Sequence, residues 1–405
     1  MQYRKLGNTG IEISALGFGA MRLPMKPDNN GAACFAMDDA VDVLSHGFEQ
    51  GINYVDTAYG YCDGQSESAV GRALKHGWRD KVYLSTKLPL GLTNERGDFR
   101  RFLEEQLRKL AVSHIDFYHF HATNADNFKN KILKLGLIEE AMKAKEQGLI
   151  RFLSFSFHDK PEEMLPIIDP GAFASVLCQY NLLDRHHDPS FKYASEKGME
   201  VMIMGPIGGG RLAFAGSVFE KAIGNRIITP ELALHLVLSN PYVDCTLSGM
   251  STHRMVDENV KAASQSSPLS QYELARINDL LKECNSLSGI YCTRCSYCMP
   301  CPFEVNIPAC LETLIYHKVY RMKQVAYEKY AFIGCSWLPG KTASACVNCG
   351  ACEKKCPQRI PVRERLTEAA AVFGKQTFAA CHGLLKHYKY KKGIDGYEKI
   401  KIYAH

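Results

Sequence analysis

The first 285 residues alternate between two apolar patterns. Short β-branched or aromatic runs, typical of buried strands, are followed by polar loops and then by segments whose apolar positions recur at the period of a helix. The predicted strands span residues 15–18, 53–56, 82–87, 115–121, 151–156, 175–180, 200–204 and 244–247. The predicted helices include 38–50, 66–76, 99–110, 135–147, 189–197, 230–239 and 252–263. A strand-and-helix unit therefore repeats along this part of the chain.

Strands that alternate with helices form parallel sheets, and the number of units favours a closed (β/α)₈ TIM barrel. An open Rossmann sheet would need Gly-x-Gly-x-x-Gly directly after the first strand, whereas the run from Gly205 to Gly210 comes late and lacks that spacing. Ahead of the barrel, residues 3–6 and 11–13 flank the turn-forming Asn8-Thr9-Gly10. This pattern predicts an N-terminal β-hairpin that closes the bottom of the barrel.

The cysteines divide the chain into two parts. Twelve of the 16 lie at or beyond Cys284, and the others are Cys34, Cys62, Cys178 and Cys245. We therefore predict two domains, a barrel over residues 1–285 and a smaller, cysteine-rich α+β domain over 286–405. Helices are expected in the second domain over residues 309–330 and 362–373.

Composition and charge exclude several classes of protein. Hydrophobic residues make up 46% of the 405 residues and charged residues 23%, which is typical of a folded globular chain. The sequence has no long apolar run, so it predicts a cytoplasmic protein with no membrane association. The net charge of +6 comes largely from residues 384–405, which are either a solvated tail or a docking segment for an acidic partner. No basic face carries stacking residues, so nucleic-acid binding is not expected.

Polar side chains end successive strands of the predicted barrel. Asp56 ends the second strand, Lys87 the third and His121 the fourth, and Tyr61 lies in the loop after Asp56. Active sites of such barrels form at this face, where a buried Lys would need the Asp as its counter-ion. A Tyr beside that ammonium would have a lowered pKa and could serve as a general acid for a carbonyl oxygen. Each residue alone also suits a structural role, but barrel interiors do not normally collect charges.

Four motifs in this region carry a family resemblance. They are Asp56-Thr57-Ala58-Tyr59-Gly60-Tyr61, Gly64-x-Ser66-Glu67-x-x-x-Gly71, Ser85-Thr86-Lys87 and the run from Ile115 to His121. In order and spacing, over about 280 residues, the chain resembles the aldo-keto reductase superfamily. The resemblance implies NAD(P)H-dependent interconversion of a small-molecule carbonyl and alcohol. Tyr61 would be the proton donor, Lys87 would lower its pKa, Asp56 would pair with Lys87, and His121 would orient the substrate.

The resemblance also implies a cofactor site at the same face. Its expected residues follow the first, fifth, sixth, seventh and eighth strands: Met21, Arg22, Ser156, Gln179, Met204, Pro206, Gly208, Ser248, Gly249, Arg254, Glu258 and Asn259. Met204 replaces a frequent Tyr, and the usual Lys near Gly249 is missing. Arg254 is the candidate cation for a ribose 2′-phosphate, which favours NADPH over NADH without excluding NADH. Arg22 either approaches the cofactor or faces solvent.

Two cysteine quartets follow the barrel. Cys346-x₂-Cys349-x₂-Cys352-x₃-Cys356-Pro357 has the spacing of a bacterial ferredoxin, and Cys292-x₂-Cys295-x₂-Cys298-x₂-Cys301-Pro302 is one residue shorter. Zinc ribbons are the alternative, but they use two pairs separated by a longer loop. The spacing favours two [4Fe–4S] clusters, one on Cys292, Cys295, Cys298 and Cys356, the other on Cys346, Cys349, Cys352 and Cys301. This arrangement resembles a barrel-plus-ferredoxin subset of the aldo-keto reductases. Spare cysteines, expected to be buried, are Cys284, Cys310, Cys335 and Cys381.

Hydride transfer moves two electrons at once, whereas an iron–sulfur cluster passes one. Three hypotheses accommodate both halves. The first is an NAD(P)H-dependent carbonyl reductase whose clusters are structural or sense oxygen. The second is an electron-transfer oxidoreductase that couples its substrate to ferredoxin through the clusters, with a flavin or an altered cofactor mode as the link and a redox protein as candidate partner. The third is a non-enzymatic redox-sensing or partner-binding protein that keeps the barrel as a scaffold, which the intact group of four polar residues disfavours.

Overall fold

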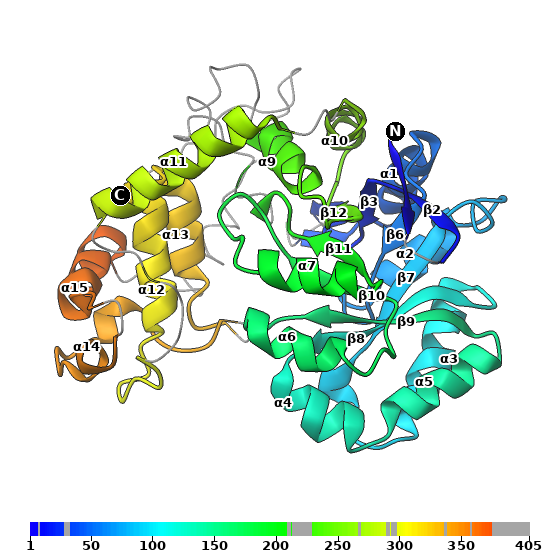
Figure 1. Ribbon diagram of the computed structural model, residues 1–405, viewed down its shortest axis with the longest axis horizontal. Helices are drawn as coiled ribbons and strands as arrows, with labels where there is room; N and C mark the ends of the chain where they lie inside the picture. The colour runs from blue at the N-terminus through cyan, green and yellow to red at the C-terminus, as the bar shows by residue number, and fades with distance from the viewer. Residues whose placement is uncertain are drawn as a thin grey trace. The chain divides into compact units, whose positions relative to one another are not determined.

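The computed structural model describes residues 1–6, 9–27, 33–208, 212, 229–265, 269–288, 292, 298–335, 338–356 and 359–374 (Figure 1). The chain divides into two compact units, Met1–Ile277 and Asn278–His405. Both this boundary and the sequence-based boundary at residue 285 fall within helix α11 (Gln271–Ser288). No helix among the described residues is long and apolar enough to cross a membrane.

The first unit is the predicted (β/α)₈ barrel. Its strands are all parallel and close in the order β10-β11-β12-β3-β6-β7-β8-β9. Their bounds lie within two residues of the predicted ones: β3 (Leu16–Gly19), β6 (Tyr54–Asp56), β7 (Tyr83–Leu88), β8 (Ile115–Thr123), β9 (Ile150–Phe157), β10 (Ser175–Gln179), β11 (Glu200–Met204) and β12 (Cys245–Ser248). The β-branched and aromatic runs of the sequence are therefore the barrel wall.

Helices connect the barrel strands. Those with the expected positions are α1 (Met37–Glu49), α2 (Ser66–Ala73), α3 (Asp98–Leu110), α5 (Leu137–Glu146), α7 (Asp188–Glu196), α9 (Thr229–Leu238) and α10 (His253–Ser264). The sequence analysis missed the short elements α4 (Ala125–Asn127), η1 (Leu90–Leu92), the π-helix η2 (Phe128–Leu133), α6 (Pro161–Ile168) and a hairpin of β4 (Met25–Pro27) and β5 (Ala33–Phe35). Helix α6 contains Pro166, a helix-breaking residue that hid the helical period.

The predicted N-terminal hairpin is present as β1 (Tyr3–Leu6) and β2 (Ile11–Ser14), with Tyr3 paired to Ser14. Its apolar side chains join the barrel's interior core, a buried cluster that consists of Leu6, Ile11, Ile13, Tyr54, Phe117, Leu177, Met202, Cys245 and Leu247. Because side chains alternate along a strand, the next inward positions on β6, β7 and β8 lie toward the carboxyl ends. These positions are Asp56, Lys87 and His119, all of which are buried. An apolar layer therefore supports a polar one.

The second unit is largely helical where it is described. Its helices are α12 (Ile307–Leu314), the π-helix η4 (Ile315–Val319), α13 (Lys323–Ala331), η5 (Ala343–Ala345), α14 (Ala351–Lys355) and α15 (Val362–Phe373). Described residues of this unit also form two isolated β-bridges, Val305 with Lys341 and Cys335 with Leu338. The single helix expected over 309–330 is wrong, because the chain turns at Arg321, whose φ of 54° is left-handed. The helix expected over 362–373 has those bounds.

Candidate active site and cysteine cavity

A buried ion pair lies where the polar strand ends meet. The ammonium Nζ of Lys87 lies 2.6 Å from Oδ1 of Asp56 and donates a second hydrogen bond of 2.7 Å to the carbonyl of Thr57. The hydroxyl of Ser85 donates to the other carboxylate oxygen of Asp56 at 2.8 Å. Lys87 is only 1% exposed. A buried charge is stable only when it is paired and hydrogen-bonded, and here both partners meet that condition.

Tyr61 lies beside this pair. The Lys87 nitrogen is 4.9 Å from the centroid of the Tyr61 ring. Burial is the largest influence on the phenol and raises its pKa above the ordinary value, while the charge of Lys87 acts in the opposite direction. The expectation of a net lowered pKa is therefore wrong, because burial outweighs the ammonium. For Lys87 itself, burial lowers the pKa, but Asp56 and Tyr61 raise it by more, so the ammonium stays charged.

His121 completes the predicted group of four. Its ring centroid lies 6.0 Å from that of Tyr61, at an interplanar angle of 81°. Burial, reinforced by the charge of Lys87, lowers the pKa of His121 to about 3. The imidazole is therefore neutral at physiological pH and can orient a carbonyl oxygen only through a neutral N–H donor. The structure thus brings Asp56, Tyr61, Lys87 and His121 together.

The sequence analysis missed His119, which faces the same interior two residues before His121. It is fully buried, it pairs in register with Lys87, and neither ring nitrogen has a hydrogen-bond partner among the described residues. Burial first and Lys87 second lower the pKa of His119 to about 3. The alternation Phe117, His119, His121 along one strand was the signal that could have identified it.

Expected cofactor residues lie at the same strand ends. Ser156 is buried in β9, and its hydroxyl accepts a 2.8 Å hydrogen bond from the backbone N–H of Ala122. Gln179 ends β10 and donates to Asp184 at 3.0 Å, which fixes its carboxamide. Five further expected residues lie at the ends of β3 and β11: Met21 and Arg22 are exposed, Met204 is partly buried, and Pro206 and Gly208 lie in the turn that follows it.

The N-terminus of α10 is the place where the sequence predicts the adenosine phosphate to bind. Thr252 caps the helix by accepting from the N–H of Met255, and the remaining N–H groups of a first helical turn favour an anion. Asn259 donates to the hydroxyl of Ser248 at 3.0 Å, which joins the helix to the end of β12. A Cβ on Gly249 would lie 3.3 Å from the Cβ of Arg22, so a larger residue there would require Arg22 to shift by a few tenths of an ångström.

Arg254 is not a free cation at this helix end. Its Nε lies 2.7 Å from Oε1 of Glu258, one helical turn further on, and both side chains are exposed. A 2′-phosphate bound by Arg254 would have to share the guanidinium with that carboxylate. This pair weakens the sequence-based argument for NADPH, which rests on Arg254 as the candidate cation for the 2′-phosphate.

The second unit contains a cavity lined by five of the predicted cluster ligands: Cys298, Cys301, Cys346, Cys349 and Cys352. Four of these five cysteines are the set that the sequence predicts to hold one cluster: Cys301, Cys346, Cys349 and Cys352. Among the described residues, no three His, Cys, Asp or Glu side chains converge on a position for a single metal ion. Thiolates spread around a cavity suit a cuboidal cluster better than a zinc ion, which draws four sulfurs to about 2.3 Å.

The other predicted set is described only in part. Cys292 and Cys356 are partly buried, and Cys298 lies in the cavity above, whereas Cys295 is outside the described residues. Of the spare cysteines, Cys310 and Cys335 are buried as expected, and burial raises the pKa of the Cys310 thiol. The side chain of Cys284 and the whole of Cys381 lie outside what the structure describes.

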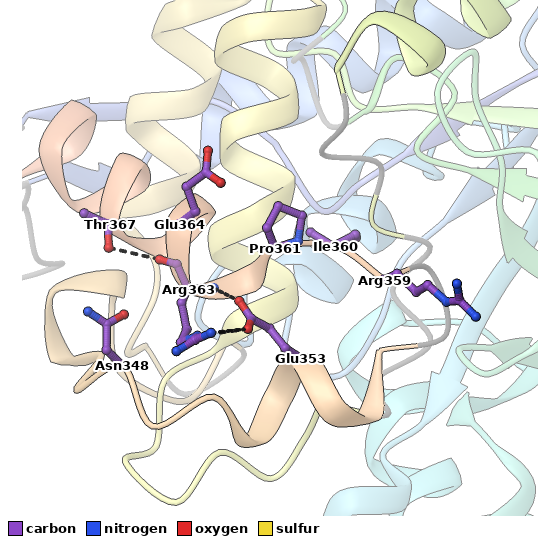
Figure 2. Close-up of a pocket in the computed structure, with 8 residues that line it drawn as sticks. All are labelled: Asn348, Glu353, Arg359, Ile360, Pro361, Arg363, Glu364 and Thr367. Atoms are coloured by element: carbon purple, nitrogen blue, oxygen red, sulfur yellow. Dashed lines mark hydrogen bonds and ion pairs between the residues drawn. The ribbon is translucent and has the colours of Figure 1, made fainter.

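Beside the cysteine cavity lies an open hollow of about 620 Å³. Figure 2 shows its lining, in which the guanidinium of Arg363 and the carboxylate of Glu353 form an ion pair and Thr367 donates to the carbonyl of Arg363. Arg363 lines both spaces. The hollow carries no thiol or imidazole among its lining residues, so we assign it no part in the chemistry.

Two family models match the chain. The model of the aldo/keto reductase family matches residues 15–218, and that of the 4Fe-4S dicluster domain matches residues 291–377. The first match covers barrel residues, and the second covers the cysteine-rich part of the chain.

Similar proteins share the barrel part. An L-galactose dehydrogenase of Arabidopsis thaliana is 28% identical over 324 residues, which are 72% of this chain and 98% of that protein. The uncharacterized oxidoreductase YqkF of Bacillus subtilis is 25% identical, over 65% of this chain and 92% of its own length. Among solved structures, the holo form of aldo-keto reductase AKR11C1 from Bacillus halodurans is similar with a TM-score of 0.60 and 26% identity, covering 69% of this chain and 96% of that one.

Proposed function

Since this chain belongs to the aldo/keto reductase family and carries a 4Fe-4S dicluster domain, we propose that it is an NAD(P)H-dependent enzyme that interconverts a carbonyl and an alcohol on a small molecule. The observation that carries the proposal is the buried Lys87–Asp56 pair beside Tyr61 and His121. Barrel interiors are normally apolar, so a buried ammonium at the strand ends requires a use.

A nicotinamide held by Ser156 and Gln179 at the ends of β9 and β10 would supply or accept a hydride at the carbonyl carbon. Tyr61 donates its phenolic proton to the carbonyl oxygen as that oxygen gains charge, which yields the alcohol and leaves a phenolate. Lys87 stabilises the phenolate electrostatically, and Asp56 keeps the ammonium in place. His121, being neutral, orients the oxygen through an N–H hydrogen bond without supplying a proton. Alcohol oxidation reverses these steps.

The substrate class we propose is a polyhydroxylated small molecule such as a sugar. Beyond the four residues of the proposed site, the chain after β10 is polar: Asp184 accepts from Gln179, the expected nicotinamide residue, and contacts His186 with its other carboxylate oxygen. Such groups suit hydroxyls better than an apolar ring system. The similarity to L-galactose dehydrogenase supports this choice. Anaerobically purified protein should oxidise an aldose or reduce its carbonyl partner with one of the two nicotinamides, and a broad screen in which no carbonyl or alcohol turns over would contradict the proposal.

Arg254 and Glu258 provide the test of nicotinamide preference. We expect Arg254→Ala to raise KM for NADPH by about tenfold, since one charge-assisted hydrogen bond contributes about 1.5–3 kcal/mol, and to change KM for NADH little. Glu258→Gln should have the opposite effect, because it releases the guanidinium from its carboxylate partner. Steady-state kinetics with both nicotinamides would measure the ratio. Equal effects of Arg254→Ala on both KM values would remove Arg254 from the 2′-phosphate site.

We propose that the eight cysteines of the two runs hold two [4Fe–4S] clusters, with Cys301, Cys346, Cys349 and Cys352 around the described cavity. Cys349→Ser should then reduce iron from about eight to about four atoms per chain and lower the visible absorbance by half. Cys310→Ser, which changes a buried thiol outside the runs, is the control and should keep the full iron content. Metal analysis under anaerobic conditions gives the result; unchanged iron in Cys349→Ser would contradict the assignment.

A redox partner is part of the proposal for the second unit. Cys349 is exposed, and so is the nearby Val347, with 55% of its surface accessible. A cluster held by Cys349 would therefore lie close to the surface and could exchange single electrons with a partner protein. The many thiols and the oxygen sensitivity of such clusters favour the cytoplasm as the compartment.

A further inference from the structure

A buried polar cluster lies on the outer side of the strands that carry the proposed site. Glu67, in the first turn of α2, is fully buried, and its Oε1 accepts hydrogen bonds from Thr86 on β7 at 2.7 Å and from Gln106 on α3 at 2.6 Å. Gln106 also donates to the backbone carbonyl of Lys87 at 3.0 Å, and its own carbonyl accepts from Tyr118 on β8 at 2.7 Å. We call Glu67, Thr86, Gln106 and Tyr118 the brace.

The brace acts on the segment that carries Lys87. Thr86 immediately precedes Lys87, and alternation along the strand makes Thr86 point outward while Lys87 points inward. The hydrogen bond from Thr86 and the hydrogen bond to the Lys87 carbonyl therefore fix the end of β7 from outside. The direction of the ammonium inside the barrel depends on that fixed backbone.

The same helix end fixes the segment that carries Tyr61. The backbone N–H of Ser66, next to Glu67, donates to the Tyr61 carbonyl at 3.2 Å. The hydroxyl of Ser66 bonds to that of Thr57 at 2.8 Å and to the carbonyl of Ala20, also at 2.8 Å. The first turn of α2 thus connects the loop that carries Tyr61 to the strand that carries Lys87. Ser66 bonds to the loop, and Glu67 bonds to the strand.

The Glu67 carboxylate holds the brace through the hydrogen bonds that its Oε1 accepts. Its Oε2 has no hydrogen-bond partner among the described residues and forms an ion pair with Lys109 at 3.7 Å, a cation that is not part of the brace. Burial raises the pKa of this carboxyl above its ordinary value. An amide at this position would supply the same acceptor without the charge.

We propose that the brace is a positioning device for the reaction, in which Glu67 and Thr86 set the separation between the Tyr61 phenol and the Lys87 ammonium. None of its members touches the reacting atoms, so they are positioning residues rather than catalytic ones. The inference rests on the function proposed above for Tyr61 and Lys87. It adds that residues on the outer face of the barrel control the electrostatic interaction between the Tyr61 phenol and the Lys87 ammonium.

The test measures the Tyr61 phenol directly, without turnover. Protein labelled with ¹³Cζ-tyrosine is titrated by NMR, and Tyr61 is assigned by its loss in Tyr61→Phe. In Thr86→Val, which removes the donated hydrogen bond at nearly constant shape, the ammonium is expected to move away. The Tyr61 midpoint should then rise by about one pH unit, which corresponds to a tenfold change in equilibrium. Glu67→Leu should act in the same direction, whereas Glu67→Gln, which keeps the acceptor, should stay near the wild-type value.

A matched control is Thr313→Val in the second unit, where a fully buried threonine hydroxyl donates to the Cys310 carbonyl at 2.7 Å. It removes a comparable hydrogen bond and should leave the Tyr61 midpoint unchanged. An unshifted midpoint in folded Thr86→Val, or a shift in Glu67→Gln as large as in Glu67→Leu, would overturn the brace. Failure to find turnover would instead count against the proposed function, because the titration does not depend on it.

Discussion

Replacing Tyr61 with Phe should lower kcat for carbonyl reduction by about 10²- to 10⁴-fold, the range that a positioned general acid contributes. The substitution removes one hydroxyl and keeps the ring that lies against Lys87 and His121. KM for the nicotinamide should change little, because the phenol acts on the carbonyl oxygen. Stopped-flow measurement of hydride transfer at saturating nicotinamide would give the rate.

The pH dependence follows from the same phenol. Reduction needs the protonated form, so its rate is constant below the pKa of Tyr61 and falls above it; oxidation needs the phenolate and rises with pH. Because burial raises that pKa in the ligand-free protein, kcat/KM for reduction should remain flat through neutral pH and fall only beyond about pH 10, the ordinary value for tyrosine. His121 should add no step near pH 6.5, because its pKa is lowered to about 3.

Tyr59→Phe is the matched control for the Tyr61→Phe substitution. Tyr59 lies in the same loop, but its hydroxyl donates to Glu105 on α3 at 3.0 Å and points away from the ion pair. The control should keep nearly the wild-type rate. If Tyr61→Phe reduces carbonyls as fast as the control does, the proton donor is another group and the mechanism fails.

The barrel and the site were predictable because both depend on local sequence periods. Buried parallel strands appear as short β-branched or aromatic runs, and the last residue of each run lies at the reactive face, so Asp56, Lys87 and His121 could be placed without coordinates. Their convergence follows from closure of the barrel: once the strands are parallel and adjacent, their carboxyl ends meet.

The features that the sequence did not predict depend on how deeply a side chain is buried and on contacts between elements far apart in the chain. The direction of the Tyr61 pKa is set by burial, which no sequence motif records, and the prediction counted only the charge of Lys87. Gln106 reaches Lys87 from α3 because of the rotational position of that helix on the barrel, a tertiary property. The turn at Arg321 likewise depends on a left-handed backbone that the apolar period of residues 309–330 does not reveal.

The largest effect on stability should come from Lys87→Met. It leaves the carboxylate of Asp56 buried, with only its bond from Ser85 among the partners seen in the described structure. Removing one partner of a buried ion pair typically costs about 3–5 kcal/mol, because the remaining charge has neither water nor counter-ion. The free energy of unfolding of the barrel unit, measured by urea denaturation, should fall by about that amount, and carbonyl reduction should be lost.

The double variant Lys87→Met with Asp56→Val separates the two roles of the pair. Replacing both charges with apolar groups close to them in size removes the desolvation cost, so much of the lost stability should return. Activity should not return, because no ammonium remains to stabilise the Tyr61 phenolate. Recovery of both properties would mean that the pair only supports the fold; recovery of neither would mean that Asp56 and Lys87 are needed to build the strand ends. Recovery of stability alone would show that a buried charge, costly for the fold, is retained for the reaction.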